Sequence, residues 1–367
     1  MPSVAADRAR LLELESHIRG LEHTLATLKL EHSTVKTRLD AVKYPVLTLP
    51  NEIVAEILVH CLPPYPNQPP LVGPSSPIPL THICSRWREI ALKTPLLWRA
   101  VYLAVPACVP SDLQNIWLSR SGHCPISVGV DDQLTRYKVG GDELIAAVLP
   151  YCARWEYVSL SIDMVDDLTL EGSMPLLRKL TVVAGFWNWK GCLDFSDAPL
   201  LRSVDLDVCA ARVIVLPWTQ LTSMRLHDIL YQGCFHFLRM TTNLVHCELS
   251  LSNMLGDEDD VREQPVTLPS LESLTIRHED KKINDCLAYL ILPKLSRLIV
   301  DTDVLLPDPI VSLTSFISNA GCQLEHLCIE GALADDSYRT ALPSIKNLVF
   351  AKMDEGEEAL GIESEWK

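Results

Sequence analysis

Residue types that carry enzyme chemistry occur in this chain without the spacing that such chemistry needs. The sequence has no G-x-x-x-x-G-K-[ST] phosphate loop, no G-x-G-x-x-G turn, no G-x-S-x-G elbow and no H-E-x-x-H pair. Histidine lies close to cysteine only as chance neighbours, such as His246 with Cys247 and His326 with Cys328, which fall in or beside predicted strands, where packing or surface roles are expected. We therefore expect a protein that is not an enzyme, with no catalytic residues, no cofactor and no metal.

Two other segments have compositions that suit binding. The acidic run 257–260 lacks the alternating ligand spacing of a calcium loop, so a solvated loop is expected. The segment GFWNWKG, 185–191, places three aromatic side chains just after a predicted strand. Those aromatics would either anchor a partner or fill a gap between repeating units.

Composition limits the class of protein. A chain of 367 residues suggests two or three domains or one elongated repeat array. The net charge of -15, from 32 Lys+Arg against 47 Asp+Glu, disfavours binding to nucleic acid. The 12 cysteines never form C-x-x-C, and neither a secretory signal nor an apolar run of membrane-spanning length is present. We expect a soluble protein of the cytoplasm, the nucleus or both, with no membrane partner.

The N-terminal segment carries a heptad repeat, which predicts a coiled-coil helix over 4–43. Apolar positions at this spacing form one seam that must be buried against another helix. That helix would belong to a second copy, giving a homodimer, or to the same chain. The seam consists of Leu11, Leu14, Ile18, Leu21, Leu25, Leu28, His32, Val35, Leu39 and Val42.

Three short helices are predicted within 44–103, interrupted by a proline-rich insertion at 62–79. Proline removes backbone donors and fixes φ, so the insertion is expected to be a flexible surface loop. A polyproline ligand for SH3 or WW modules is the alternative. After the insertion, apolar residues recur at helical spacing up to Lys93, and Pro95 is placed to begin a third helix.

A fragment of the form L-x-x-L-x-L recurs through 110–353 and predicts short, half-buried strands. Five copies carry a proline two residues before the first Leu, and the segments between copies vary in length and pattern. This periodicity is typical of leucine-rich repeats, so we expect an α/β fold with an irregular solenoid over 110–353 and an acidic, flexible tail over 354–367. The nine fragments begin at Trp155, Leu177, Leu201, Leu221, Leu244, Leu271, Leu295, Leu324 and Ile345.

The predicted helices of 44–103 resemble the F-box. The resemblance covers about Leu47 to Leu103, and it rests on the Leu49-Pro50 start, Ile53 with Ile57 one turn later, the block around Trp87 and the ending at Trp98. With WLSRSG at 117–122 and the leucine-rich C-terminal region, the layout is similar to the large fungal group of F-box-like proteins. The resemblance implies a small all-α F-box.

It also implies the substrate receptor of an SCF-type E3 ubiquitin ligase, docked on the Skp adaptor of a cullin-RING module. A coiled-coil scaffold outside any ligase is the alternative. The adaptor-binding residues that the resemblance implies are Leu49, Pro50, Ile53, Ile57, Leu58, Ile83, Cys84, Trp87, Leu96 and Trp98. The unknown target protein is expected at outward strand positions: Arg178, Arg202, Asp205, Arg225, Glu248, Glu272, Arg297 and Glu325.

Overall fold

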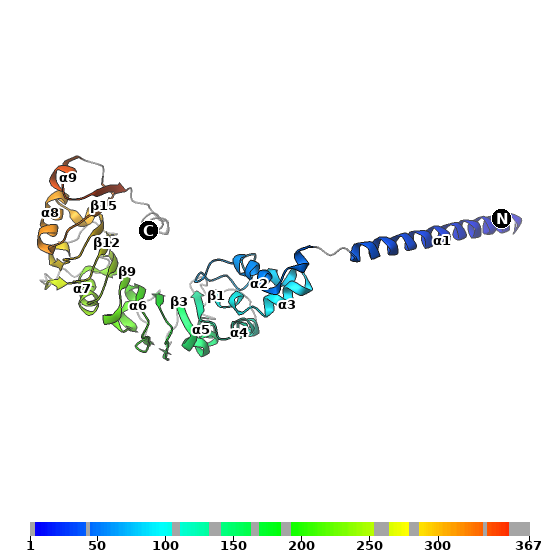
Figure 1. Ribbon diagram of the computed structural model, residues 1–367, viewed down its shortest axis with the longest axis horizontal. Helices are drawn as coiled ribbons and strands as arrows, with labels where there is room; N and C mark the ends of the chain where they lie inside the picture. The colour runs from blue at the N-terminus through cyan, green and yellow to red at the C-terminus, as the bar shows by residue number, and fades with distance from the viewer. Residues whose placement is uncertain are drawn as a thin grey trace.

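One long parallel sheet dominates the structure, which is a computed structural model (Figure 1). It describes residues 4–41, 45–104, 111–131, 141–162, 169–184, 192–252, 264–278, 286–332 and 336–351. In these residues eleven strands pair in the order β1-β2-β3-β5-β7-β9-β10-β12-β14-β15-β16. Their bounds are β1 (Ala100–Ala104), β2 (Ile126–Asp131), β3 (Trp155–Ile162), β5 (Lys179–Ala184), β7 (Ser203–Asp207), β9 (Ser223–Leu230), β10 (His246–Ser252), β12 (Ser273–His278), β14 (Arg297–Asp301), β15 (His326–Glu330) and β16 (Asn347–Ala351).

The strands form because apolar residues recur at every second position. In β7, for example, Val204 and Leu206 are buried while Ser203, Asp205 and Asp207 are half-buried. The register aligns the buried positions of successive strands, so the apolar side chains stack in rows beneath the sheet. The opposite face of the same strands carries the polar side chains.

The connections between strands lie along the outer side of the arc that the sheet describes, and the strands line its inner side (Figure 1). The helices are α4 (Ser111–Arg120), α5 (Gly141–Val148), α6 (Val208–Val213), α7 (Tyr231–Met240), α8 (Pro309–Ala320) and α9 (Asp336–Ala341). Four 3-10 turns accompany them: η4 (Leu149–Arg154), η5 (Trp218–Gln220), η6 (Cys286–Tyr289) and η7 (Thr302–Leu305). Two small parallel sheets also belong to this layer, one of β4 (Thr169–Leu170), β6 (Cys192–Asp194) and β8 (Ile214–Val215), the other of β11 (Val266–Thr267) and β13 (Leu290–Ile291).

An aspartate at the end of a strand ties neighbouring elements together. The carboxylate of Asp207 accepts hydrogen bonds from the backbone N–H of Ala184, at the end of β5, and of Ala210 in α6, both at 2.7 Å. Asp207 therefore caps α6 and links β5 to β7. Burial raises the pKa of this carboxyl group above its usual value. Asp301 at the end of β14 caps η7 in the same way, with Oδ1 3.1 Å from the backbone N of Asp303.

The predicted leucine-rich-repeat solenoid is wrong, because the structure is an α/β fold with a continuous eleven-stranded parallel sheet. The nine leucine-rich fragments do overlap strands, but β1 and β2 belong to the same sheet and come from segments outside those fragments. The described connections are helices, 3-10 turns or strands of two or three residues, in no repeating order. Short half-buried strands joined by crossovers occur in any parallel α/β sheet, so the leucine spacing did not specify a repeat.

The predicted small all-α F-box is also wrong. Its range contains α2 (Asn51–His60), η2 (Pro79–His82), α3 (Ser85–Leu92) and η3 (Pro95–Leu97), but also β1, the edge strand of the large sheet. Val54, Leu58 and Trp98 belong to the same apolar core as the strands, and the Trp98 ring meets Trp117 of α4 edge-on at 5.1 Å. Helices this short cannot enclose a core alone, and here the sheet completes it.

The proline-rich insertion, predicted as a flexible surface loop, is anchored to the sheet. Tyr102 of β1 donates its N–H to the carbonyl oxygen of Pro69 at 2.8 Å. The Tyr65 hydroxyl donates to Glu156 of β3 at 2.8 Å, and the Ser127 hydroxyl of β2 donates to the carbonyl oxygen of Pro66 at 2.6 Å. The insertion therefore lies across the first three strands.

Helix α1 (Val4–Asp40) extends away from the rest of the molecule (Figure 1). Every residue of α1 whose side chain is described is exposed, so no described part of the chain covers the heptad seam. The helix of the predicted coiled coil is therefore present, but no second helix within the described chain pairs with it. Also outside the described residues are the end of the predicted helix at 42–43, the aromatic segment 185–191, the acidic run 257–260 and the predicted tail 354–367.

Candidate protein-binding surfaces

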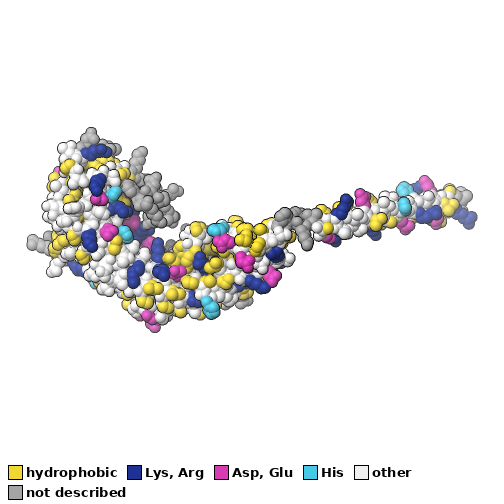
Figure 2. Space-filling view, in the orientation of Figure 1, with side chains coloured by type: hydrophobic (Ala, Val, Ile, Leu, Met, Phe, Trp, Pro, Cys, Tyr) yellow, Lys and Arg dark blue, Asp and Glu magenta, His cyan; other side chains and the backbone are white. Residues whose placement is uncertain are grey.

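The first candidate surface, here called the docking face, consists of the exposed apolar side chains Leu47, Ile53, Ile57, Ile83 and Leu96. Their exposed fractions are 36%, 49%, 37%, 54% and 43%. Figure 2 shows apolar side chains gathered over the region of α2 and α3. Clustered apolar exposure of this kind marks interaction sites more often than isolated exposed residues do.

The helical period explains why α2 presents apolar residues on two sides. Val54 and Leu58 are fully buried, and α2 contacts α3 and η3. Ile53 and Ile57, one position earlier in each turn, point outward to water. The core therefore fixes the helix while its neighbouring face stays available.

Arg86 of α3 holds the chain that leads into α2. Its guanidinium donates to the carbonyl oxygens of Leu47 and Leu49, the latter at 2.7 Å, and to Oδ1 of Asn51 at 3.1 Å. The sulfur of Cys84 accepts from the backbone N–H of Trp87 at 3.4 Å and so caps α3. These bonds set the position of the docking face relative to the core.

The structure divides the ten residues implied by the F-box resemblance. Leu58 and Trp98 are buried, at 0% and 1% exposed, and they support the core. Leu49, Cys84 and Trp87 are half-buried, whereas Pro50, Ile53, Ile57, Ile83 and Leu96 are exposed. Sequence reasoning missed Leu47 and Arg86. Arg86 lies within the block around Trp87, but nothing in its spacing pointed to the carbonyl groups that it binds.

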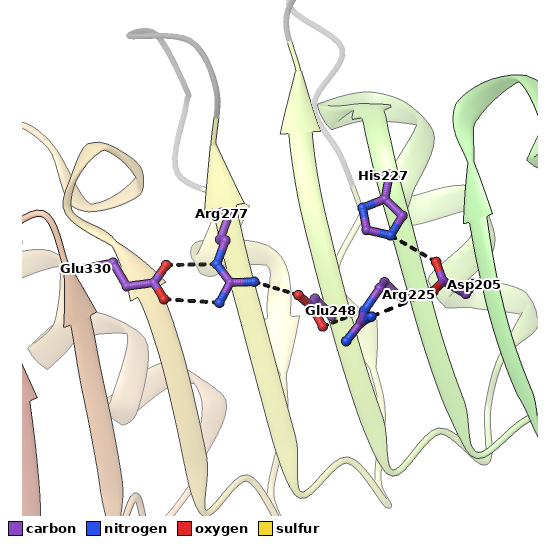
Figure 3. A network of polar contacts seen from close by, with 6 residues as sticks. All are labelled: Asp205, Arg225, His227, Glu248, Arg277 and Glu330. Carbon is purple, nitrogen blue, oxygen red and sulfur yellow. Dashed lines mark hydrogen bonds and ion pairs between the residues drawn. The ribbon is translucent and has the colours of Figure 1, made fainter. Parts of the chain in front are cut away.

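The second candidate surface is the charge ladder, a row of paired side chains on the polar face of the sheet (Figure 3). Its members are Asp205, Arg225, His227, Glu248, Arg277 and Glu330, from β7, β9, β10, β12 and β15. Acidic and basic groups alternate along the row. Cross-strand pairs of opposite charge stabilise neighbouring strands.

The ladder is continuous through short contacts. Arg225 lies 3.7 Å from Asp205 and 2.7 Å from Glu248. Glu248 also accepts from Arg277 at 2.6 Å, and Arg277 binds both carboxylate oxygens of Glu330, at 2.9 and 3.1 Å. Arg277 therefore reaches across β14, which lies between β12 and β15. Such two-pronged Arg–carboxylate pairs are geometrically demanding, and they hold the side chains in place.

Two groups of the ladder have shifted pKa values. The Oδ1 of Asp205 accepts a hydrogen bond from Nε2 of His227 at 2.9 Å, which raises the pKa of His227 above its usual value. The hydrogen bonds to Glu330 raise the pKa of Arg277. The exposed fractions of the ladder side chains run from 12% for Glu330 to 41% for His227, so the row is reachable from solvent.

Three of the eight predicted target-binding residues, Asp205, Arg225 and Glu248, belong to the ladder. Arg178 pairs instead with Glu156 at 3.0 Å, and Glu325 pairs with Lys346 at 2.6 Å. Arg202, Glu272 and Arg297 are exposed. Sequence reasoning missed His227, Arg277 and Glu330. Each of the three follows directly after the last residue of an L-x-x-L-x-L fragment. Side chains alternate between the two faces of a strand, so extending the alternation by one residue past the fragment would have placed all three on the outward face.

Three of the described cysteines have shifted pKa values that bear on their reactivity. Burial raises the pKa of the thiols of Cys247, Cys322 and Cys328, which keeps them protonated and poorly nucleophilic. No group of three or more His, Cys, Asp or Glu side chains within the described ranges is placed to hold a metal ion. Among the described helices, none has the length and apolar character needed to cross a membrane.

Comparison with known proteins gives no family. A scan against models of protein families finds no match, and a search of curated proteins finds no relative.

Proposed function

We propose that this chain is the receptor subunit of an SCF-type ubiquitin ligase. The docking face would bind the Skp adaptor, and the polar face of the sheet would bind the target protein. The observation that carries the proposal is the exposure of Ile53, Ile57, Ile83 and Leu96 in the segment whose sequence resembles the F-box.

The energetics favour a protein partner at this face. Burying an exposed isoleucine or leucine side chain contributes roughly 1.5–3 kcal/mol when it leaves water completely. Five such side chains, each partly exposed, are of the apolar kind found at the centres of protein interfaces. Their positions are also fixed in advance by the core and by Arg86, which lowers the entropy lost on binding.

The proline-rich insertion leaves this face open. Tyr65 and Pro66 contact β2 and β3, Pro69 contacts β1, and Leu71 is buried. With the insertion anchored in this way, Ile53 and Ile57 are still 49% and 37% exposed. The length of the insertion is therefore compatible with adaptor binding.

The charge ladder suits the recognition of a polar target. Its acidic and basic groups are already paired and held by both neighbours, so a target meets a fixed pattern of charges with little reordering. The pattern favours a target segment of alternating charge over an apolar one. Half-buried carboxylates such as Asp205, 17% exposed, retain lone pairs for such contacts.

A binding measurement with purified proteins tests the proposal. The full chain should bind recombinant Skp adaptor in calorimetry, and Ile53→Glu combined with Ile57→Glu should abolish binding. The control is Val311→Glu, which places the same charge at a 58% exposed residue of α8. Absence of binding by the unmodified chain, or equal loss in the control, would reject the adaptor function.

A scaffold outside any ligase is the second candidate, and the uncovered seam of α1 favours it. In that case the chain would self-associate or bind other proteins, and the adaptor would bind neither the unmodified chain nor the variants.

A further inference from the structure

We propose that α1 pairs with α1 of a second copy of this chain, as a parallel, in-register, two-stranded coiled coil. The seam residues Leu11, Ile18, Leu21, Leu25 and Leu28 are each 52–60% exposed. Helix α1 contains 37 residues, and no described part of the chain covers it. A long helix with an uncovered heptad seam gains stability mainly from a partner helix.

The heptad assignment follows from the alternating spacing of three and four residues. Positions a are Leu11, Ile18, Leu25, His32 and Leu39, and positions d are Leu14, Leu21, Leu28 and Val35. Two outward apolar residues, Leu12 and Leu30, lie off the seam, and most of the e and g positions that flank the seam hold charged residues.

The charges that flank the seam are complementary to themselves in a parallel pair. In that arrangement position g of one helix faces position e of the next heptad in the other helix. Arg10 then faces Glu15 of the second copy, and Glu31 faces Lys36 of the second copy. His17 faces Glu22, and Thr24 faces Lys29, so no pair of like charges arises along the described helix.

His32 decides between the two orientations. A parallel, in-register pair sets His32 opposite His32, where one neutral imidazole can donate its N–H to the ring nitrogen of the other. An antiparallel pair over the same seam sets His32 opposite a leucine, leaving its polar nitrogens without a partner inside the seam. A single polar residue at position a is a known device for fixing register.

The proposal goes beyond adaptor binding, because it gives each assembly two docking faces and two sheets. Two linked sheets raise the effective concentration of the second binding site once the first is occupied. A target with two recognition segments would then bind more tightly to the dimer than to one copy.

Mass measurement of the full chain in solution tests the pairing. In sedimentation or light scattering over the micromolar range, the unmodified chain should have twice its mass of 41.0 kDa. Ile18→Glu with Leu25→Glu should give the single mass. The control, Leu12→Glu with Leu30→Glu, adds the same charges outside the seam and should stay dimeric. Circular dichroism verifies that each variant is folded.

A monomeric unmodified chain, or a control as monomeric as the seam variant, overturns the pairing. Because adaptor binding uses α2 and α3, Ile53→Glu with Ile57→Glu should remain dimeric. Failure of the dimer is therefore distinguishable from failure of the adaptor function.

Charge reversal tests the orientation. Lys36→Glu places a carboxylate opposite Glu31 in a parallel dimer and should raise the dissociation constant about tenfold, the effect of about 1.4 kcal/mol. Adding Glu31→Lys should restore the original value. In the full-length antiparallel arrangement Lys36 faces Glu15, so the second change would not restore affinity, and that result overturns the parallel orientation.

Discussion

His227 is the residue of the charge ladder whose charge depends on ordinary pH. Its pKa is raised chiefly by the hydrogen bond to Asp205. We predict that Asp205→Asn lowers the pKa of His227, as measured by an NMR titration of the imidazole C–H signals. Glu325→Gln, which changes a distant carboxylate paired with Lys346, should leave this pKa unchanged. An equal pKa in the Asp205 variant and the unmodified chain would contradict the assigned pair.

The same pair makes a pH-dependent contribution to stability. A histidine whose folded pKa lies above its unfolded value, about 6.5, stabilises the fold fully below that unfolded value. The contribution is lost as the pH rises through the raised folded pKa. We predict that His227→Asn lowers the free energy of unfolding more at pH 5.5 than at pH 8.5, measured by urea denaturation. An effect that is larger at the higher pH would contradict this sign.

Glu248 is the residue that joins the two halves of the ladder, because it binds both Arg225 and Arg277. Its side chain is 24% exposed, so the two pairs are partly shielded from solvent. We predict that Glu248→Gln lowers the free energy of unfolding by about 1–2 kcal/mol. Glu325→Gln breaks a pair whose members are 46% and 69% exposed, and it should lower the free energy of unfolding less than Glu248→Gln does. Equal losses would show that the ladder is no more than a set of surface pairs.

At the scale of the element, α2 separates the residues that hold the fold from those that face a partner. Leu58 is fully buried, and Leu58→Ala should lower the free energy of unfolding by about 2–5 kcal/mol. Ile57 is 37% exposed, so Ile57→Ala should lower the free energy of unfolding by about 0.5 kcal/mol or less. Ile57→Ala should nevertheless weaken adaptor binding. A destabilisation of equal size in both variants would place Ile57 in the core and remove it from the docking face.

The proline-rich insertion gives a second prediction for an element. Tyr65 anchors it, through the hydroxyl bond to Glu156, an edge-on contact with Tyr157 at 5.6 Å and Arg99 stacked 3.8 Å from its ring. We predict that Tyr65→Ala speeds amide hydrogen exchange in 62–79, while Val72→Ala, at a 53% exposed residue, leaves it unchanged. Fast exchange already present in the unmodified chain would contradict the anchored loop.

The elements themselves were partly predictable from sequence. The two-residue alternation of apolar residues located β3 and the later strands, and the spacing around Ile53 and Trp87 located α2 and α3. The anchoring of the insertion was not predictable, because it depends on Tyr65 and Gln68 meeting strand residues more than fifty positions away. The exposed residues of the docking face were predictable only in part. The helical period shows that Ile53 and Val54 point in different directions, but the sequence does not say which of the two directions faces the core.

At the scale of the whole molecule, the continuous core explains why the predicted division into a small helical unit and a repeat array failed. The core includes Val54 in α2, Trp117 in α4 and Leu342 near the C-terminal end of the described chain. The spacing of leucines predicts that one face of a strand is buried, but it does not predict with which other strands that strand pairs. Strand β1, unrecognised in the sequence, is what joins the helical segment to the sheet.

Three surfaces of the molecule lie on separate elements. We propose that the seam of α1 pairs two copies, that the docking face binds an adaptor and that the polar face of the sheet receives a target. Because these surfaces lie on different elements, each can be disabled without disturbing the others.

The central claim is that the docking face connects this chain to a cullin-RING ligase. Its most direct measurement is quantitative affinity purification of the tagged full chain from cells, comparing cullin and Skp adaptor peptides among variants. We predict that both are enriched with the unmodified chain and with Val311→Glu, and that both are lost with Ile53→Glu combined with Ile57→Glu. Enrichment of cullin and adaptor that survives the double change, or their absence from the unmodified chain, would contradict the account.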